Sequence, residues 1–237
     1  MLLDSIKFGL LLKRGLSAPF CIVFLLIFIL VFYFPAAQAV EIDSAMMNTI
    51  EKKYGEYAKR RVVGWQKFIK ENQNKNLSEK EKLKLVNNFF NIYEFVPDNI
   101  HWMQEDYWAT PLEFVVSGGG DCEDFAIVKY FTLIALKVPE EKLLITYVKA
   151  LRLNQAHMVL TYYETPNSMP LVLDNLIGEI KPASERTDLA PVYSFNGIGV
   201  WLATRSGKGK SVGKSTDMNR WTEMVRRMDI GTIAPFR

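Results

Sequence analysis

The residue best suited to covalent chemistry is Cys122, which follows Gly118 to Gly120 and lies between Asp121 and Glu123. The apolar pattern after it predicts a helix, so the cysteine is expected at a helix N-terminus. Free N–H groups and the helix dipole favour an anion there. The sequence therefore predicts a nucleophilic thiol of lowered pKa, whose N–H helps to bind an oxyanion. A purely structural role as a small buried cysteine fits the glycines and acids poorly.

A cysteine nucleophile needs a base, and the chain contains two histidines, His101 and His157. His157 lies in the alternating segment 155–163, which predicts a β-strand. An imidazole fixed on a strand can pair with a thiolate on a packed helix. His101 lies in an aromatic stretch and is interpreted as a solvated loop residue. His157 is therefore the candidate base, and a structural histidine with satisfied hydrogen bonds is the alternative.

A third group should orient the imidazole, and the candidate is Asp174. It ends the apolar run from Pro170 to Leu173, and a carboxylate at the end of a buried strand needs a partner because burying an unpaired charge is costly. The alternative is a turn-forming aspartate before Asn175. Cysteine, histidine and aspartate in the order helix, strand, strand form the constellation of papain-like and transglutaminase-like folds.

The first half of the chain is predicted to be helical. Residues 43–70 have helical periodicity with a break expected near Gly55 or Gly64, and Ser78 with Glu81 forms the capping box of a second helix. A third, short helix begins at Thr110 and Pro111 after an irregular aromatic segment, 98–110, and the nucleophile helix follows.

The second half changes to the alternation of β-strands. Strands are expected at 143–151, 155–163, 170–173, 191–195 and 198–203, then a flexible loop of Gly, Lys and Ser at 205–216 and a last helix at 217–229. Helices followed by strands predict an α+β fold in which the N-terminal helices and the nucleophile helix pack on an antiparallel sheet.

The first 39 residues have the pattern of a signal peptide. Basic residues precede an apolar run from Phe20 to Phe34, and Ala37 and Ala39 form a small-residue cleavage site. The run is about 15 residues long, short of the ~20 that span a bilayer. Cleavage before Val40 is expected, and an uncleaved inner-membrane anchor is the alternative. Both interpretations place one domain, residues 40–237, in the periplasm.

Composition narrows the classes of function. The chain has 237 residues, 49% of them hydrophobic and 23% charged, which is ordinary for a globular domain. Of its net charge of +3, the first 39 residues carry +2, so the rest is nearly neutral and no nucleic-acid partner is expected. Cys21 lies in the predicted signal peptide, so the mature chain would keep Cys122 alone and form no internal disulfide.

Several separated segments, in the same order along the chain, resemble the bacterial transglutaminase-like cysteine proteinases, and among them the LapG-type periplasmic proteases. The segments are Gly119 to Ala126 with Lys129 to Phe131, Asn154 to Leu160, Pro170 to Asn175, and Pro191 to Asn196. The resemblance covers roughly residues 65–202. It implies a papain-like or transglutaminase-like fold with Cys122 as nucleophile, His157 as base and Asp174 as the orienting acid.

The resemblance also implies a calcium cofactor. In the family, the acids that flank the nucleophile, here Asp121 and Glu123, are tied to calcium binding, and Asp124 is a further candidate. Carboxylates suit calcium, which takes several oxygen ligands. Alternatively, these acids only satisfy the helix N-terminus.

The family's substrates are large repeat adhesins on the cell surface, cut near the N-terminus so that the adhesin is released and the biofilm disperses. Its partner is an inner-membrane receptor that senses cyclic-di-GMP and sequesters the protease. By resemblance, the chain is therefore expected to be a calcium-dependent periplasmic endopeptidase under cyclic-di-GMP control.

Two other functions are compatible with the same residues. A transglutaminase-type acyl transferase would use the same triad with an amine as acceptor in place of water. A non-catalytic calcium-dependent binding module would use the groove without turnover. For the protease, the Cys122 N–H and Trp108 are the candidate oxyanion donors.

Overall fold

The computed structural model describes residues 42–204 and 207–236, so the predicted signal peptide lies outside the described residues. In this part of the chain, no helix is both long enough and apolar enough to cross a bilayer. The α-helices are α2 (Ser44–Tyr54), α3 (Glu56–Gln73), α4 (Glu79–Phe90), α5 (Asp98–His101), α6 (Pro111–Ser117), α7 (Cys122–Ala135) and α8 (Asn219–Ile230).

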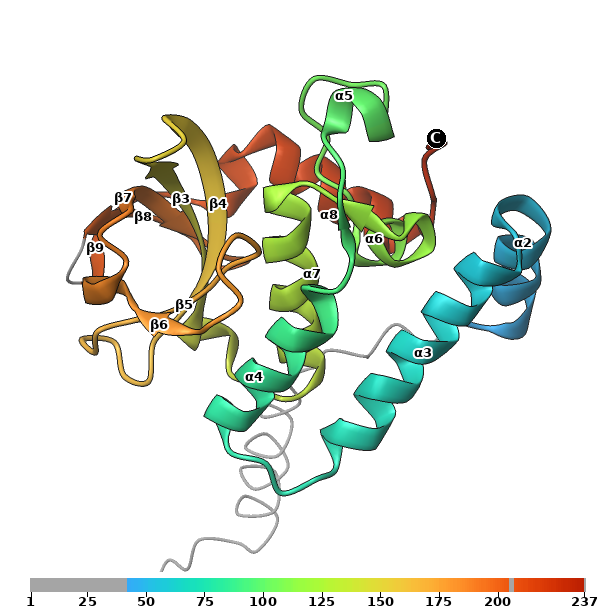
Figure 1. The fold of residues 1–237 in the computed structure, drawn as a ribbon, viewed down its shortest axis with the longest axis horizontal. Helices are drawn as coiled ribbons and strands as arrows, with labels where there is room; N and C mark the ends of the chain where they lie inside the picture. Colours follow the sequence, from blue (N-terminus) through green and yellow to red (C-terminus); the bar gives the residue numbers. More distant parts are fainter. Residues whose placement is uncertain (1–41, 205–206, 237) are drawn as a thin grey trace, which may run out of the picture. The chain divides into compact units, whose positions relative to one another are not determined.

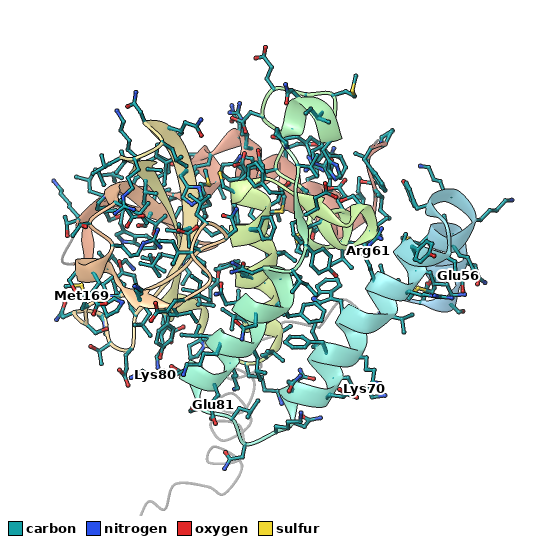
Figure 2. The ribbon with its side chains drawn as sticks, in the orientation of Figure 1. Glu56, Arg61, Lys70, Lys80, Glu81 and Met169 are labelled. Atoms are coloured by element: carbon teal, nitrogen blue, oxygen red, sulfur yellow. The ribbon has the colours of Figure 1, made fainter. Side chains whose placement is uncertain are left out.

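The predicted break in the first helical region is at Gly55, which separates α2 from α3. Its φ of 87° lies in the region that only glycine adopts without strain, whereas Gly64 stays inside α3. The capping box of Ser78 and Glu81 begins α4 as predicted. Figure 2 labels Arg61 on α3, whose guanidinium donates to the carbonyls at the end of α6 and joins the two helices.

The strands of the main sheet are β3 (Leu143–Ala150), β4 (Gln155–Tyr162), β5 (Leu171–Leu173), β6 (Lys181–Pro182), β7 (Leu189–Phe195), β8 (Val200–Thr204) and β9 (Gly207–Gly213). Their order is β6-β5-β4-β3-β7-β8-β9, and every neighbouring pair is antiparallel. The predicted flexible loop at 205–216 is wrong for 207–213, because these residues pair with β8 as an edge strand, with register shifts. Lysines and glycines on an edge strand discourage pairing with other chains.

Helix α7 is the centre of the domain. In Figure 1 it lies between the sheet and helices α3, α4 and α6, with α8 on the same side of the sheet. Its apolar side chains, including Phe125, Ile127 and Leu133, belong to one continuous core with Leu160 of β4 and Phe195 of β7. The nucleophile candidate therefore sits on the most extensively packed helix.

Two further short strands hold the segment before α7. Strand β1 (Glu94–Phe95) pairs in parallel with β2 (Gly119–Gly120). A Cβ on Gly119 would lie 2.2 Å from the Glu94 carbonyl oxygen, and one on Gly120 would lie 2.3 Å from an Asp124 carboxylate oxygen. The glycines are thus required by close approach within the protein itself.

The sequence context of His101 suggested a solvated loop residue, and this interpretation is wrong. His101 ends α5 and is only 4% exposed, and its ring stacks on Phe236 and meets Trp102 edge-on. The segment was expected to be irregular. Trp102 of this segment and Phe236 of the C-terminal segment bury the imidazole.

Candidate active site

Cys122 is the first residue of α7, as predicted, and Asp121 is the N-cap. The Asp121 N–H donates to Asp124 Oδ2 at 3.3 Å, so an acid of the first turn accepts from the N-cap backbone. This placement leaves the Cys122 N–H among the backbone donors at the helix start that have no partner within the helix.

The thiol of Cys122 has two polar neighbours. Its Sγ lies 3.0 Å from Glu123 Oε2, to which it donates, and it also lies within reach of the backbone N–H of Met158, the residue after His157. The prediction of a lowered thiol pKa is wrong for this arrangement. Burial raises the pKa of the Cys122 thiol most, and the charges of Glu123 and Asp121 raise it further. Burial and these charges act against the lowering that a helix N-terminus favours.

His157 and Asp174 meet across two neighbouring strands. Leu160 of β4 pairs with Leu173 of β5, which places His157 near the residue that follows β5. His157 Nε2 lies 2.8 Å from Asp174 Oδ1, and the two residues are 5% and 1% exposed. Because Nε2 is engaged, Nδ1 is the ring nitrogen left to exchange a proton with a thiol.

Arg186 is a part of the site that sequence reasoning missed. Its Nη2 donates to Asp174 Oδ2 at 2.7 Å, and its guanidinium also binds Asp188 at 2.8 and 2.9 Å. Burial alone would raise the pKa of Asp174. The hydrogen bond and charge of His157, the Leu176 N–H and Arg186 lower it to about 2 instead. Asp174 is therefore held as a carboxylate.

A second cluster of carboxylates lies beside the thiol. Ligand atoms of Asp98, Asp121 and Asp124 lie within 4.8 Å of one another, and so do those of Asp98, Asp106 and Glu123. The sequence predicted Asp121, Glu123 and Asp124 but missed Asp98, which comes from α5. Burial, followed by the charges of other acids, raises the pKa of Asp121 and Asp124, and burial raises that of Asp98 to about 7.

These residues fit a hard divalent cation. All the donors are carboxylate oxygens, the ligands that calcium takes. Asp98 Oδ1 and Asp121 Oδ1 are buried and have no hydrogen-bond partner. Buried acceptors without a partner are costly, and a cation would satisfy both.

The loop before α6 connects this acidic cluster to the rest of the site. Asp98 accepts from the Tyr107 N–H, and Asp124 Oδ1 accepts from the Ala109 N–H at 2.7 Å. Between them, Trp108 stacks on Phe195 at 5.5 Å. The oxyanion role of Trp108 stays a prediction.

Helix α8 braces the same loop from the other side. The guanidinium of Arg227 donates to the Trp108 carbonyl and lies 4.3 Å from the centre of the Tyr107 ring. Glu113, which is fully buried, accepts from Tyr107 Oη at 2.8 Å and from the Ala234 N–H at 2.9 Å. The loop is therefore fixed by both the acids and the C-terminal segment.

Residues 52–195 match the model of the bacterial transglutaminase-like cysteine proteinases. Among curated protein sequences, none matches the chain. The match agrees with the mixed helices and antiparallel sheet, so the predicted fold class is confirmed.

Solved structures give a closer comparison. Legionella pneumophila LapG is 44% identical, with a TM-score of 0.64 over 77% of this chain and 97% of its own. Its calcium-bound form is 45% identical, with a TM-score of 0.64 over 77% and 98%. Its EGTA-treated form is 45% identical, with a TM-score of 0.66 over 77% and 97%. These relatives and the family model both indicate a cysteine protease.

Proposed function

Because the chain belongs to the bacterial transglutaminase-like cysteine proteinases, we propose that it is a calcium-dependent endopeptidase with Cys122, His157 and Asp174 as its catalytic triad. The observation that carries this proposal is the buried pair of His157 and Asp174, in which His157 lies on β4, a strand packed against the helix that Cys122 begins. The pair engages Nε2 and leaves Nδ1 for the thiol.

Each residue has one task in the proposed reaction. Cys122 Sγ attacks the scissile carbonyl carbon, and the Cys122 N–H stabilises the resulting oxyanion. His157 takes the thiol proton at Nδ1 and gives it to the leaving amine. Water then hydrolyses the acyl-enzyme. Asp174 keeps the proton of His157 on Nε2, and the Arg186 guanidinium holds Asp174 in place.

In this proposal, Asp98, Asp121, Glu123 and Asp124 hold the calcium ion. The solved relative with bound calcium and the two unpartnered carboxylate oxygens support the assignment. When bound, the ion supplies positive charge beside the thiol. That charge opposes the effect of Glu123 and Asp121, which raise the pKa of Cys122.

We further propose that the substrate is a large repeat adhesin, cut near its N-terminus in the periplasm, and that an inner-membrane cyclic-di-GMP receptor sequesters the protease. The family resemblance supports the substrate and the receptor. The signal-peptide pattern of residues 1–39 supports export, whether the segment is cleaved or kept as an anchor.

The first test is cleavage of an adhesin N-terminal fragment by the purified protein, in calcium and in EGTA, with Cys122→Ala as the control. The proposal expects cleavage by the wild type in calcium only. Undiminished cleavage by Cys122→Ala would contradict the triad. Cleavage that is unaffected by EGTA would mean that the proposed calcium ligands have only a structural role. Amine incorporation without hydrolysis would favour the acyl transferase.

A further inference from the structure

Lys129 is a buried cation that the proposed triad does not use. It lies on α7 two turns after Cys122 and is 1% exposed. Burial lowers its pKa to about 7, against the opposing effect of Asp174. A lysine so deeply buried is costly to maintain, and its single hydrogen-bond partner among the described residues is the side chain of Asn91.

Asn91 links Lys129 to the catalytic acid. Lys129 Nζ donates to Asn91 Oδ1 at 2.6 Å, and Asn91 Nδ2 donates to the Asp174 backbone carbonyl at 2.8 Å. Asn91 is the C-cap of α4. One turn earlier, Asn87 Nδ2 donates to the Gly178 carbonyl at 2.8 Å. Two amides of α4 thus hold the segment that carries Asp174.

The ammonium decides which way the Asn91 amide faces. A protonated lysine only donates, so the amide oxygen must face Lys129 and the amide nitrogen must face Asp174. Without the ammonium, the amide could rotate and place its oxygen against the Asp174 carbonyl. That orientation sets acceptor against acceptor, and the backbone of Asp174 would lose its donor.

We propose that Lys129 is a positioning residue, which fixes the orientation of Asn91 and through it the backbone that sets Asp174 against His157. The Arg186 guanidinium and the Leu176 N–H hold the carboxylate of Asp174, whereas Asn91 holds its main chain. This inference rests on the proposed triad. Small displacements of a catalytic group reduce turnover strongly.

The test measures alkylation of Cys122 by iodoacetamide against pH, quantified by mass spectrometry of the Cys122 peptide, together with kcat and KM for the adhesin fragment. The variants are Lys129→Met, Asn91→Ala and the double variant. Asn91→Asp is a second probe, because a carboxylate still pairs with Lys129 but has no donor for Asp174. Lys142→Met is the control, since this lysine pairs with Glu79 instead.

Each single variant is expected to lower kcat and the alkylation rate at neutral pH by roughly tenfold, with KM nearly unchanged. Because Lys129 acts through Asn91, the double variant should also lose only about tenfold. Asn91→Asp should lose as much as Asn91→Ala while melting at the wild-type temperature or above. Lys142→Met should match the wild type.

Wild-type kcat in both Lys129→Met and Asn91→Asp would overturn the proposal. So would a loss of roughly a hundredfold in the double variant, because independent effects multiply. Failure of the proposed function is distinguishable from either result, since a wild-type protein that cleaves no better than Cys122→Ala would show it.

Discussion

Asp174→Asn changes one oxygen into an NH2 group at the most constrained carboxylate of the site. In the native protein, Oδ1 accepts from His157 Nε2 and the Leu176 N–H, and Oδ2 accepts from Arg186 Nη2. An amide has one accepting end. If its NH2 group faces Arg186, two donors meet. If the NH2 group faces His157, the ring must accept at Nε2, so its proton moves to Nδ1 and it is no longer a base for Cys122.

The magnitudes follow from these two orientations. Loss of the correct tautomer lowers kcat by roughly 10⁴-fold in a triad of this kind. For stability, the pKa of Asp174 is lowered from 3.8 to about 2, a difference that corresponds to about 2 kcal/mol. Arg186 keeps Asp188 but loses the charge of Asp174, which adds to this loss, so a decrease of about 3 kcal/mol in the free energy of unfolding is expected.

The assay is steady-state cleavage of the adhesin fragment, with urea unfolding of the same preparations. Asp188→Asn is the matched control, because Asp188 binds the same guanidinium but is 21% exposed at its side chain and does not contact His157. It should change kcat by less than about threefold. A kcat for Asp174→Asn within about tenfold of the wild-type value would refute the proposed role of this carboxylate.

Three other changes have expected outcomes. The stabilisation from Asp174 is complete above about pH 5 and is lost progressively as the pH falls to about 1, so over that window the wild type should lose about 2 kcal/mol more than Asp174→Asn, as measured by urea unfolding. Glu113→Gln turns one of two buried carboxylate oxygens into an NH2 group, so either Tyr107 and Ala234 or the Thr110 N–H loses its acceptor. The unfolding free energy measured in urea should fall by about 3 kcal/mol, with the exposed Glu223→Gln as control. Calcium at a hundred times its Kd should stabilise the protein by about 2.7 kcal/mol, and a thermal scan in which Asp98→Asn keeps this whole increment would remove Asp98 from the metal site.

Local patterns in the sequence were sufficient for the helices that begin with strong signals. The capping box at Ser78, the pair Thr110 and Pro111, and the glycines before Cys122 predicted where α4, α6 and α7 begin. The strand that carries His157 was predicted from alternation, and the strand that ends before Asp174 was predicted from its apolar run. These signals act over a few residues, so a single sequence contains them.

The contacts between distant segments were not predictable in this way. Arg186 and Asn91 look like ordinary polar residues of a loop and a helix end, and only the folded sheet and α4 bring them to Asp174. Asp98 reaches the acids around Cys122 from a segment more than twenty residues earlier. The prediction of a lowered pKa for the Cys122 thiol was wrong for a related reason. The helix dipole is a local effect that the sequence indicates, whereas burial depends on the whole fold.

The bracing by Arg227 and Ala234 has a consequence for the order of synthesis. The loop that carries Trp108 is held by Arg227, and Glu113 of α6 is held by Ala234. Both partners come more than a hundred positions later in the chain. A chain still being made lacks these partners, even when Cys122, His157 and Asp174 have all emerged. Since a domain generally folds as a unit, we expect the Trp108 loop to be fixed only after Arg227 and Ala234 have emerged, and a chain truncated before Arg227 should lack this support.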